Sequence, residues 1–462
     1  MYGQFLNRVK AEYFISVVLF RILIDLIYFN SISQRFSYEG YANARTPETA
    51  AASWILLIVS YLFMHRILAN DTERNSNIIV TVLYFVSFIP FTTCISAGMI
   101  STGFMIYNTV YWLALLFFQT VSETAEIKPF ARIRAGELGL REITIAAIGV
   151  LSLIVIIFIS WKYTGFRLTV NLLSVYDLRA EARGYAFPKA LSYLFAWVLA
   201  VNPVLLGLSL IRKKWAMALM FFAAQMLCFG VNGLKTTFFM PFVVIFVILF
   251  SAYGVYPNIK KVIICGLCAV MILAIAETMI AQTTNITDIV VRRVFFVPNN
   301  LGERYYDFFS NNPPDYFRSS FLRHFGFSSP YTADGSKGFT YIIGALYFGK
   351  PQMNCNNGLS SDALANLGIF GCLIMPLALI IVLRIFDRST VNVSSVVSIT
   401  PALLIAYNLI STMLTTVLLT HGMIILIIMM MILGNNPEDE DIQQYSNSIS
   451  ASNEKPQIAL NS

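Results

Sequence analysis

The sequence predicts an all-α polytopic membrane protein with about twelve transmembrane helices, and three properties of the chain support this. Of its 462 residues, 57% are hydrophobic and only 12% are charged, whereas a soluble chain needs roughly a quarter of its residues charged. Apolar segments recur along the chain, each close to the roughly 20 residues that cross a bilayer. These segments are continuously apolar and lack the alternation of barrel strands, so helices are expected. Cytosolic enzymes, disordered scaffolds and free nucleic-acid-binding proteins are thereby excluded.

The predicted spans succeed one another from the N-terminus to residue 433. Their cores are residues 13–30, 50–66, 77–95, 104–121, 143–160, 191–211, 216–232, 238–253, 262–280, 361–383, 393–410 and 415–433. We therefore expect a single transmembrane domain over residues 1–433. Residues 434–462 are polar and acidic at their start, which predicts a disordered cytoplasmic tail.

The orientation follows from lysine and arginine, which accumulate in short cytoplasmic connections. With the N-terminus inside, every strongly basic short connection falls on the cytoplasmic side. These residues are Arg66, Arg74, Lys128, Arg132, Arg134, Arg141, Arg212, Lys213, Lys214, Lys260, Lys261, Arg384 and Arg388. Both termini are thus predicted to be cytoplasmic, and the two long loops, 161–190 and 281–360, lie on the outer side.

Both outer loops carry more basic than acidic residues, although positive charge is normally avoided on that side. Long translocated loops tolerate charge, which is one explanation. The other is an anionic ligand, because arginine outnumbers lysine in these loops and its planar guanidinium suits phosphate or carboxylate. The arginines are Arg167, Arg179, Arg183, Arg292, Arg293, Arg304, Arg318 and Arg323.

The first outer loop contains a short segment, 176–184, in which acidic and basic residues alternate at one-turn spacing. Asp177 and Glu181 are four residues apart, as are Arg179 and Arg183. This spacing predicts a helix whose charges either pair on its surface or present the two arginines to an anionic lipid head group. Further along, the sequence Gly-Leu-Lys-Thr-Thr, which contains Lys235, predicts a turn on the same outer side with a lysine at a helix start.

The second outer loop combines arginines with many aromatic residues between 290 and 309, a composition typical of a segment in the membrane interface. It ends in Asn-rich sequence before a span, where Ser360 or Ser361 is a suitable N-cap and Asp362 follows directly. Free amides at such a helix start could hold a phosphate, although an ordinary cap is the simpler explanation. His324 is the one histidine of an outer loop and is a candidate general base, a structural role being the alternative.

Together these features resemble the bacterial O-antigen and capsular oligosaccharide repeat-unit polymerases. The resemblance is carried by the twelve spans with both ends inside, the two large basic outer loops, and three short strings: YDLRAEARG, GLKTT and NCNNGLSSDALANLGIFG. It implies a multi-pass protein of the bacterial inner membrane whose outer loops are periplasmic. It also implies a glycosyltransferase that moves a growing glycan from undecaprenyl pyrophosphate to the non-reducing end of a new lipid-linked repeat unit.

The resemblance and the residues together define an expected site. Pyrophosphate or substrate would be bound by Arg179, Arg183, Lys235, Arg292, Arg293, Arg304 and Arg323. The acceptor hydroxyl would lose its proton to one of His324, Asp362, Asp177 and Glu181. No metal and no cofactor are expected. The expected partners are lipid-linked repeat units, membrane lipids and a chain-length regulator, with no nucleic acid.

Two other functions compete with this interpretation. An O-antigen ligase or another lipid-linked glycosyltransferase would share a large late periplasmic loop. A polysaccharide flippase or other transporter would be expected to show paired, symmetric halves and charges at the midplane, whereas the charges here concentrate in the outer loops.

Overall fold

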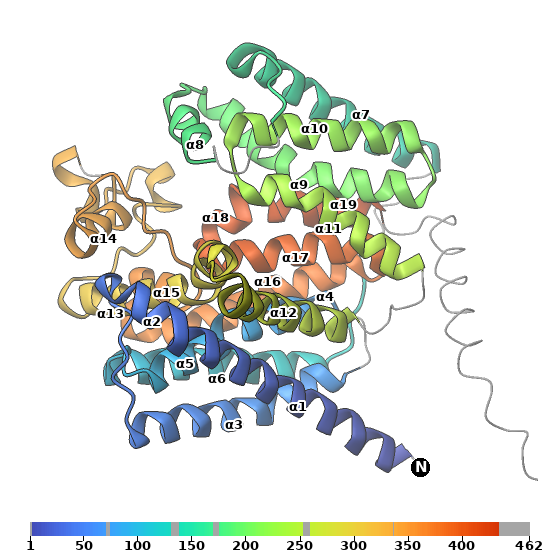
Figure 1. Cartoon of the computed structure of the whole chain (residues 1–462). Helices are drawn as coiled ribbons and strands as arrows, with labels where there is room; N and C mark the ends of the chain where they lie inside the picture. The colour runs from blue at the N-terminus through green and yellow to red at the C-terminus, as the bar shows by residue number, and fades with distance from the viewer. Residues whose placement is uncertain are drawn as a thin grey trace, which may run out of the picture. The chain divides into compact units, whose positions relative to one another are not determined.

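The computed structural model describes residues 2–70, 74–130, 138–169, 175–252, 259–335 and 337–433, and within these ranges the chain contains helices and no strand (Figure 1). Nine of the described helical segments are long and apolar enough to cross a membrane, as in a multi-pass membrane protein. They coincide with nine of the twelve predicted spans. The predicted tail, 434–462, lies outside the described residues.

The described helices divide into two compact units, which we treat separately. Unit 1 comprises residues 1–126, 258–384 and 406–416, and unit 2 comprises 127–257, 385–405 and 417–462. The expectation of a single transmembrane domain stays a prediction.

Unit 1 begins with four long helical segments, and its outer side carries several short ones. Its helices are α1 (Tyr2–Ile27), α2 (Ser33–Arg35), α3 (Pro47–Ala69), α4 (Asn75–Leu83), α5 (Ile89–Ser96), α6 (Thr102–Thr124), α12 (Ile259–Ala276), α13 (Val297–Asn311), α14 (Phe339–Phe348), α15 (Ser360–Leu367) and most of α16 (Gly371–Thr390). α3 packs against α1, α5 and α6, while α13 packs against α15 and α6. In Figure 1 the blue and cyan helices α1, α3, α5 and α6 lie side by side.

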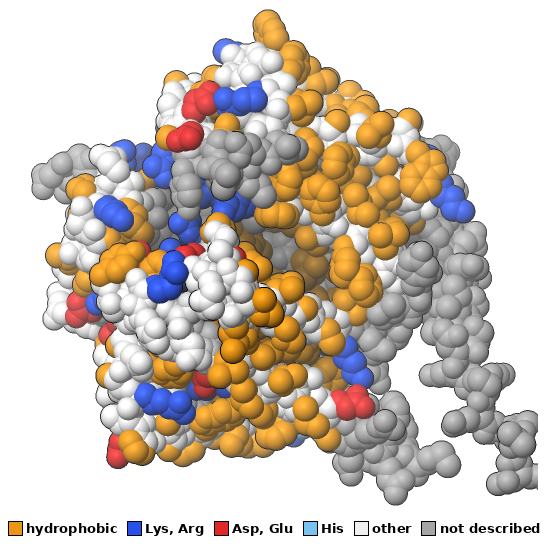
Figure 2. Space-filling model, viewed as in Figure 1, with side chains coloured by type: hydrophobic (Ala, Val, Ile, Leu, Met, Phe, Trp, Pro, Cys, Tyr) orange, Lys and Arg blue, Asp and Glu red, His pale blue; other side chains and the backbone are white. Residues whose placement is uncertain are grey.

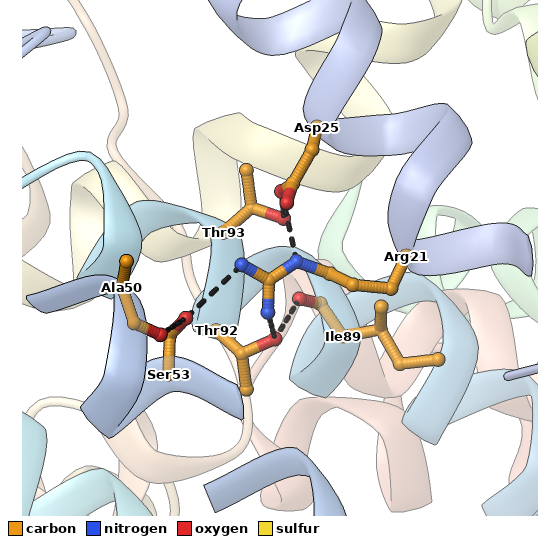
Figure 3. A network of polar contacts seen from close by, with 7 residues as sticks. All are labelled: Arg21, Asp25, Ala50, Ser53, Ile89, Thr92 and Thr93. Atoms are coloured by element: carbon orange, nitrogen blue, oxygen red, sulfur yellow. Dashed lines mark hydrogen bonds and ion pairs between the residues drawn. The ribbon is translucent and has the colours of Figure 1, made fainter. Parts of the chain in front are cut away.

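A buried polar network ties the first helices of unit 1 together (Figure 3). Arg21 and Asp25, one turn apart in α1, form an ion pair in which the Arg21 Nε donates to Asp25 Oδ1 at 2.8 Å. The same guanidinium donates to the hydroxyls of Thr92 (2.7 Å) and Ser53 (3.2 Å), and Thr93 donates to Asp25. Since a buried charge is tolerated only when it is paired and hydrogen-bonded, this network fixes α1 against α3 and α5.

Basic residues at the predicted cytoplasmic end of unit 1 cap helices. The Lys260 Nζ donates to the carbonyls of Ile67, Leu68 and Asn70, the last residues of α3 and its cap. Arg384 donates to three carbonyls at the end of α6, one of them that of Ser122. Positive charge near free C-terminal carbonyls is favourable, so these residues stabilise the fold, while the orientation that they predict stays a prediction.

Unit 2 is built on α7 (Leu138–Ile159), α9 (Lys189–Ile211), α10 (Trp215–Asn232) and α11 (Lys235–Ala252), which pack on one another. The short helix α8 (Val175–Gly184) packs on α10. Hydrophobic side chains cover much of the surface in Figure 2. Among the side chains of these helices, Leu219 is 69% exposed and Val150 is 56% exposed. Such exposure of large apolar side chains suits contact with lipid.

The last two predicted spans differ from expectation in length. α17 (Ser395–Ser411) has 17 residues, and the segment expected as one span at 415–433 is divided into α18 (Leu414–Leu419) and α19 (Met423–Leu433). The Trp197 Nε1 donates to the carbonyl of Leu419, and Gly422 follows with a φ of +77°. This carbonyl therefore has a partner outside the helix, and a left-handed glycine ends the turn. The expected continuous span is wrong here, and the count of twelve stays a prediction.

Candidate functional site

The second outer loop places Arg292 against the connection between α2 and α3. A wide, π-helical segment (Thr287–Phe296) precedes α13 and carries Arg292, whose Nη1 donates to Glu39 Oε2 at 2.5 Å. The guanidinium carbon lies 4.1 Å from the centre of the Phe36 ring, and the side chain is only 12% exposed. Its Nε is buried and has no hydrogen-bond partner among the described residues. This N–H is therefore a donor that the described residues leave unsatisfied.

Arg304 reaches the same turn from the next helix. It lies on α13, and a methyl group placed on Gly40 would come within 2.4 Å of its Nη2. Its guanidinium carbon is 5.6 Å from the Tyr347 ring, and its buried Nε also lacks a partner in the described part of the chain. Arg292 and Arg304 thus contact consecutive residues, Glu39 and Gly40. We call Arg292, Arg304, Glu39 and Gly40 the arginine pocket.

The arginine pocket depends on the left-handed conformation of Gly40. Its φ of +94° is accessible to glycine and costly for other residues, and its missing side chain leaves room for the Arg304 guanidinium. Asn300 holds the turn from α13 by donating to the carbonyl of Glu39 at 2.9 Å. Behind it, Tyr41 is 1% exposed, and burial raises the pKa of its phenol.

Acidic residues balance part of this positive charge. Arg35 and Asp288 form an ion pair at 2.8 Å. Glu303, which precedes Arg304 in α13, is half-buried and accepts a hydrogen bond from the Ser101 backbone N–H at 3.1 Å. Burial raises the pKa of Glu303, and the hydrogen bonds from Ser101 and the charge of Arg304 lower it less. A carboxyl with a raised pKa beside a cation suits proton transfer.

The first outer loop, in unit 2, uses two of its arginines to end α10. Arg167 donates from Nε and Nη2 to the carbonyl of Gly230, at 3.3 and 3.0 Å, and Arg179 donates from Nε to the carbonyl of Gly233 at 3.0 Å. α8 is held there by Leu178, which packs on Phe229. Because free carbonyls at a helix end favour cations, Arg167 and Arg179 have a structural function at this position.

The remaining predicted residues of α8 are exposed or paired. The predicted helix is confirmed, but Glu181 pairs with Arg167 at 2.8 Å and accepts the Tyr185 hydroxyl at 2.6 Å, and these bonds lower its pKa. A carboxylate stabilised in this way is a weak base. Asp177, in the first turn, and Arg183, in the last, are exposed.

The turn predicted around Lys235 is confirmed. α10 ends at Asn232, Gly233 has a φ of +59°, and Lys235 is the first residue of α11. The Asn232 side chain accepts from the Leu234 N–H and donates to Thr237, so it stabilises the start of α11. Lys235 also has an interaction partner.

Asp362 is buried and is not part of the arginine pocket. It is 1% exposed, and its two carboxylate oxygens accept from the Asn366 amide and the Leu414 N–H, each at 2.7 Å. The predicted cap is wrong as well, because α15 begins at Ser360 after Leu359, which has a φ of +52° and makes no side-chain cap. A substrate hydroxyl cannot reach a carboxylate whose surroundings are closed, so we exclude Asp362 as the general base. The phosphate site expected at this helix start stays a prediction.

Three further residues of the second outer loop were predicted to belong to the site: Arg293, Arg323 and His324. Arg293 is exposed and has a partner. Arg323 is exposed in a one-turn helix, Leu322–Phe325. The side chain of His324, in the same turn, lies outside the described part of the structure.

The expectation that residues 290–309 lie in the membrane interface is wrong for their aromatic side chains. Phe295, Phe296 and Tyr305 are at most 1% exposed, and Phe308 and Phe309 are 7% exposed. They form the core of the outer part of unit 1, because α13 is covered by α15, α14 and α6.

Sequence reasoning missed Arg35, Glu39, Gly40 and Glu303. One signal was available, since Arg35 and Arg45 put two arginines into the short outer connection between the first two spans, against the usual charge distribution. Glu303 gave no signal, because its burial depends on packing against α6.

Comparisons with known proteins found no match. These comparisons covered family models, curated proteins and solved structures.

Proposed function

We propose that this protein is a polymerase of lipid-linked oligosaccharide repeat units in a bacterial inner membrane. It would transfer a growing glycan from undecaprenyl pyrophosphate to the non-reducing end of a new repeat unit on the periplasmic face. The observation that carries this proposal is the arginine pocket, in which two partly exposed guanidinium groups converge on one turn and are oriented there by their contacts with Glu39 and Gly40. Such donors suit the oxygens of a diphosphate.

The arginine pocket would act on the leaving group. As the bond between the anomeric carbon and the pyrophosphate oxygen breaks, its electron pair stays with the diphosphate, where negative charge accumulates. Arg292 and Arg304 would stabilise this charge through donors that are already oriented, by Glu39 and Phe36 in one case and by Gly40 in the other. Because these donors need little reorganisation, they act more strongly than solvated lysines would.

Glu303 is the residue we assign to the acceptor. The attacking sugar hydroxyl forms the new bond to the anomeric carbon and loses its proton, which Glu303 would accept. Its pKa is raised by burial, so its ionised form is a better base than an ordinary carboxylate. Asp177, exposed on α8, and His324 stay as candidates, whereas the pairing of Glu181 with Arg167 weakens it as a base.

The proposal is tested by incubating the purified protein with a synthetic undecaprenyl-pyrophosphate repeat unit and no nucleotide sugar. A ladder of products that differ by one repeat unit supports the polymerase. Absence of products from protein that is folded and membrane-embedded contradicts it.

The ligase alternative is separated in cells. A deletion strain that keeps single repeat units on its lipid core has lost a polymerase, and one that has no repeat units on the core has lost a ligase. A deletion strain that has lost a transporter would instead retain lipid-linked repeat units on the cytoplasmic face.

A further inference from the structure

Residues 313–331, between α13 and α14, form a segment that we call the aromatic strap (gold in Figure 1). Its anchor is Asp315, which is 0% exposed. One carboxylate oxygen of Asp315 accepts from the N–H and the hydroxyl of Ser319, both at 2.7 Å, and the other accepts from the Ser329 hydroxyl. Both ends of the aromatic strap are therefore tied to one buried carboxylate.

Hydrogen bonds attach the residues around Asp315 to the start of an apolar helical segment. The Asp315 N–H donates to the carbonyl of Ala365 at 2.7 Å, and the Phe317 N–H donates to the side chain of buried Asn366 at 2.9 Å. Both acceptors lie in α15, which opens the apolar segment Ser360–Thr390. The aromatic strap is thus held at one end of a helix that is long enough to cross the membrane.

Side chains suited to lipid begin immediately after this attachment. Ile369 is 63% exposed and Phe370 is 71% exposed, and they follow Ala365 by four and five residues in the turn that joins α15 to α16. Pro314 packs directly on Gly368, where an added Cβ would lie 2.9 Å from the proline Cγ. The aromatic strap therefore lies at the level at which the lipid-facing surface of this span starts.

The aromatic strap exposes four of its aromatic side chains. Tyr316 is 52% exposed, Phe321 43%, Phe325 66% and Phe327 55%. Tyr316 and Phe317 have φ angles of +53° and +61°, which are unfavourable for such residues and are maintained here beside the Asp315 anchor. These rings contrast with those of residues 295–309, which are buried in the core.

Charge on the aromatic strap favours an anionic surface. Arg323 is exposed within the aromatic patch, and Arg318 lies over the Tyr316 ring at 5.7 Å while its Nε donates to the carbonyl of Asp315. The one acidic residue of the strap, Asp315, is buried in the anchor. Aromatic rings beside arginines are typical of segments in the head-group region of a bilayer.

We infer that the aromatic strap docks on the outer leaflet of the surrounding phospholipid bilayer. Phe321, Phe325 and Phe327 enter the boundary between head groups and acyl chains, and Arg323 contacts lipid phosphate. The strap thereby fixes the level of the second outer loop relative to the membrane surface. This inference does not depend on the proposed glycosyltransferase activity.

The test uses tryptophan as a depth probe in the full-length protein. Phe325→Trp places the probe at the most exposed phenylalanine of the strap, and Phe327→Trp is a second reporter. Ser310→Trp is the matched control, because Ser310 is exposed on the last turns of α13 beside the polar Asn311 and Asn312. Emission of the five native tryptophans is measured on the unsubstituted protein and subtracted.

Each variant is placed in nanodiscs of phosphatidylcholine brominated either near the acyl carbonyl or near the terminal methyl. We expect the added emission of Phe325→Trp and Phe327→Trp to be lost mainly with bromine near the carbonyl, and Ser310→Trp to be unaffected by either lipid. Acrylamide in solution should quench Ser310→Trp more strongly than the strap variants. The inference is wrong if both strap variants behave like Ser310→Trp, which would place the strap in water. It is also wrong if they are shielded from brominated lipid and acrylamide alike, which would mean that protein covers the strap.

Discussion

Both outer loops contain arginines, but the arginines of the two loops have different contacts. In the first loop, Arg167 and Arg179 donate to backbone carbonyls at the end of α10. In the second loop, Arg292 and Arg304 are held by an acidic residue, an aromatic ring and a glycine, and each retains a buried Nε–H with no acceptor in the described ranges. An arginine whose donors are used by a helix end stabilises the fold, whereas the oriented guanidinium groups of the arginine pocket are the ones that we propose bind a ligand.

The largest expected effect is the loss of polymerisation in the double variant Arg292→Ala/Arg304→Ala. Removal of oriented donors to a developing negative charge costs about 10²–10³-fold per donor, so the double variant should form no detectable ladder. Product length is measured with the purified protein and the synthetic lipid-linked repeat unit. Arg292→Lys/Arg304→Lys is the control that keeps the charge but loses the planar donors, and we expect it to recover only a small part of the activity. A ladder of normal length from the alanine variant would refute the assignment.

The second prediction compares two glutamates with opposite pKa shifts. Glu303→Gln should lower the rate by roughly 10²-fold or more, because it removes the proposed base. In the unsubstituted protein the rate should fall as the pH drops through the raised pKa of Glu303, since protonation removes the base, and this dependence should be absent in the residual activity of the variant. Glu181→Gln should leave the rate and its pH profile unchanged.

The same two glutamates should contribute to the pH dependence of folding stability with opposite signs. Glu181 has a lowered pKa, so it contributes stability above its ordinary pKa that is lost as the pH falls through the lowered value. Glu303 has a raised pKa, so the folded state binds its proton more tightly and stability decreases as the pH rises from the ordinary to the raised value. Thermal unfolding of the unsubstituted protein and of each Gln variant is measured across acidic pH, and the difference between the two gives the slope that each glutamate contributes. Slopes of equal sign would contradict the two assignments.

The third prediction compares two left-handed glycines, Gly40 in the arginine pocket and Gly165 in the first outer loop. Gly40→Ala introduces backbone strain and a contact of 2.4 Å with the Arg304 Nη2, whereas Gly165→Ala, at a φ of +57°, meets nothing within 4 Å. Both should lower stability by about 1 kcal/mol through backbone strain. Only Gly40→Ala should also shorten the glycan ladder, because it displaces Arg304. Equal ladders from the two variants would mean that the position of Arg304 does not matter.

The smallest effect on glycan synthesis is expected from substitutions at the end of α10. Arg167→Ala removes hydrogen bonds to the Gly230 carbonyl and the ion pair with Glu181, which should cost about 1–2 kcal/mol. Its apparent Tm should fall while the surviving protein makes a ladder of normal length. Arg183→Ala, at an exposed position, should change the Tm little. If Arg167→Ala abolished the ladder without changing the Tm, its structural role would be wrong.

Sequence patterns predicted most of the fold because span length and helix periodicity are local properties. α8 was predictable from the spacing of Asp177 and Glu181, and the turn before Lys235 from its glycine. The interruption after Leu419 was not, because it depends on Trp197, more than two hundred residues away in the chain.

The candidate site was only partly predictable for the same reason. Arg292 and Arg304 were expected from residue type and position, but their common partner, the Glu39–Gly40 turn, comes from a distant connection. Asp362 looked accessible because it follows a polar loop. Its burial was not predictable, because it depends on a distant part of the chain, where the Leu414 N–H donates to its carboxylate.

The most direct test of the central claim is the binding of undecaprenyl pyrophosphate, the leaving group, to the purified protein. We predict that Arg292→Ala/Arg304→Ala weakens this binding by roughly 10²-fold or more, because charge-assisted hydrogen bonds contribute about 1.5–3 kcal/mol each, and that Arg167→Ala binds as tightly as the unsubstituted protein. Equal affinity in all three proteins, or a loss confined to Arg167→Ala, would contradict the account.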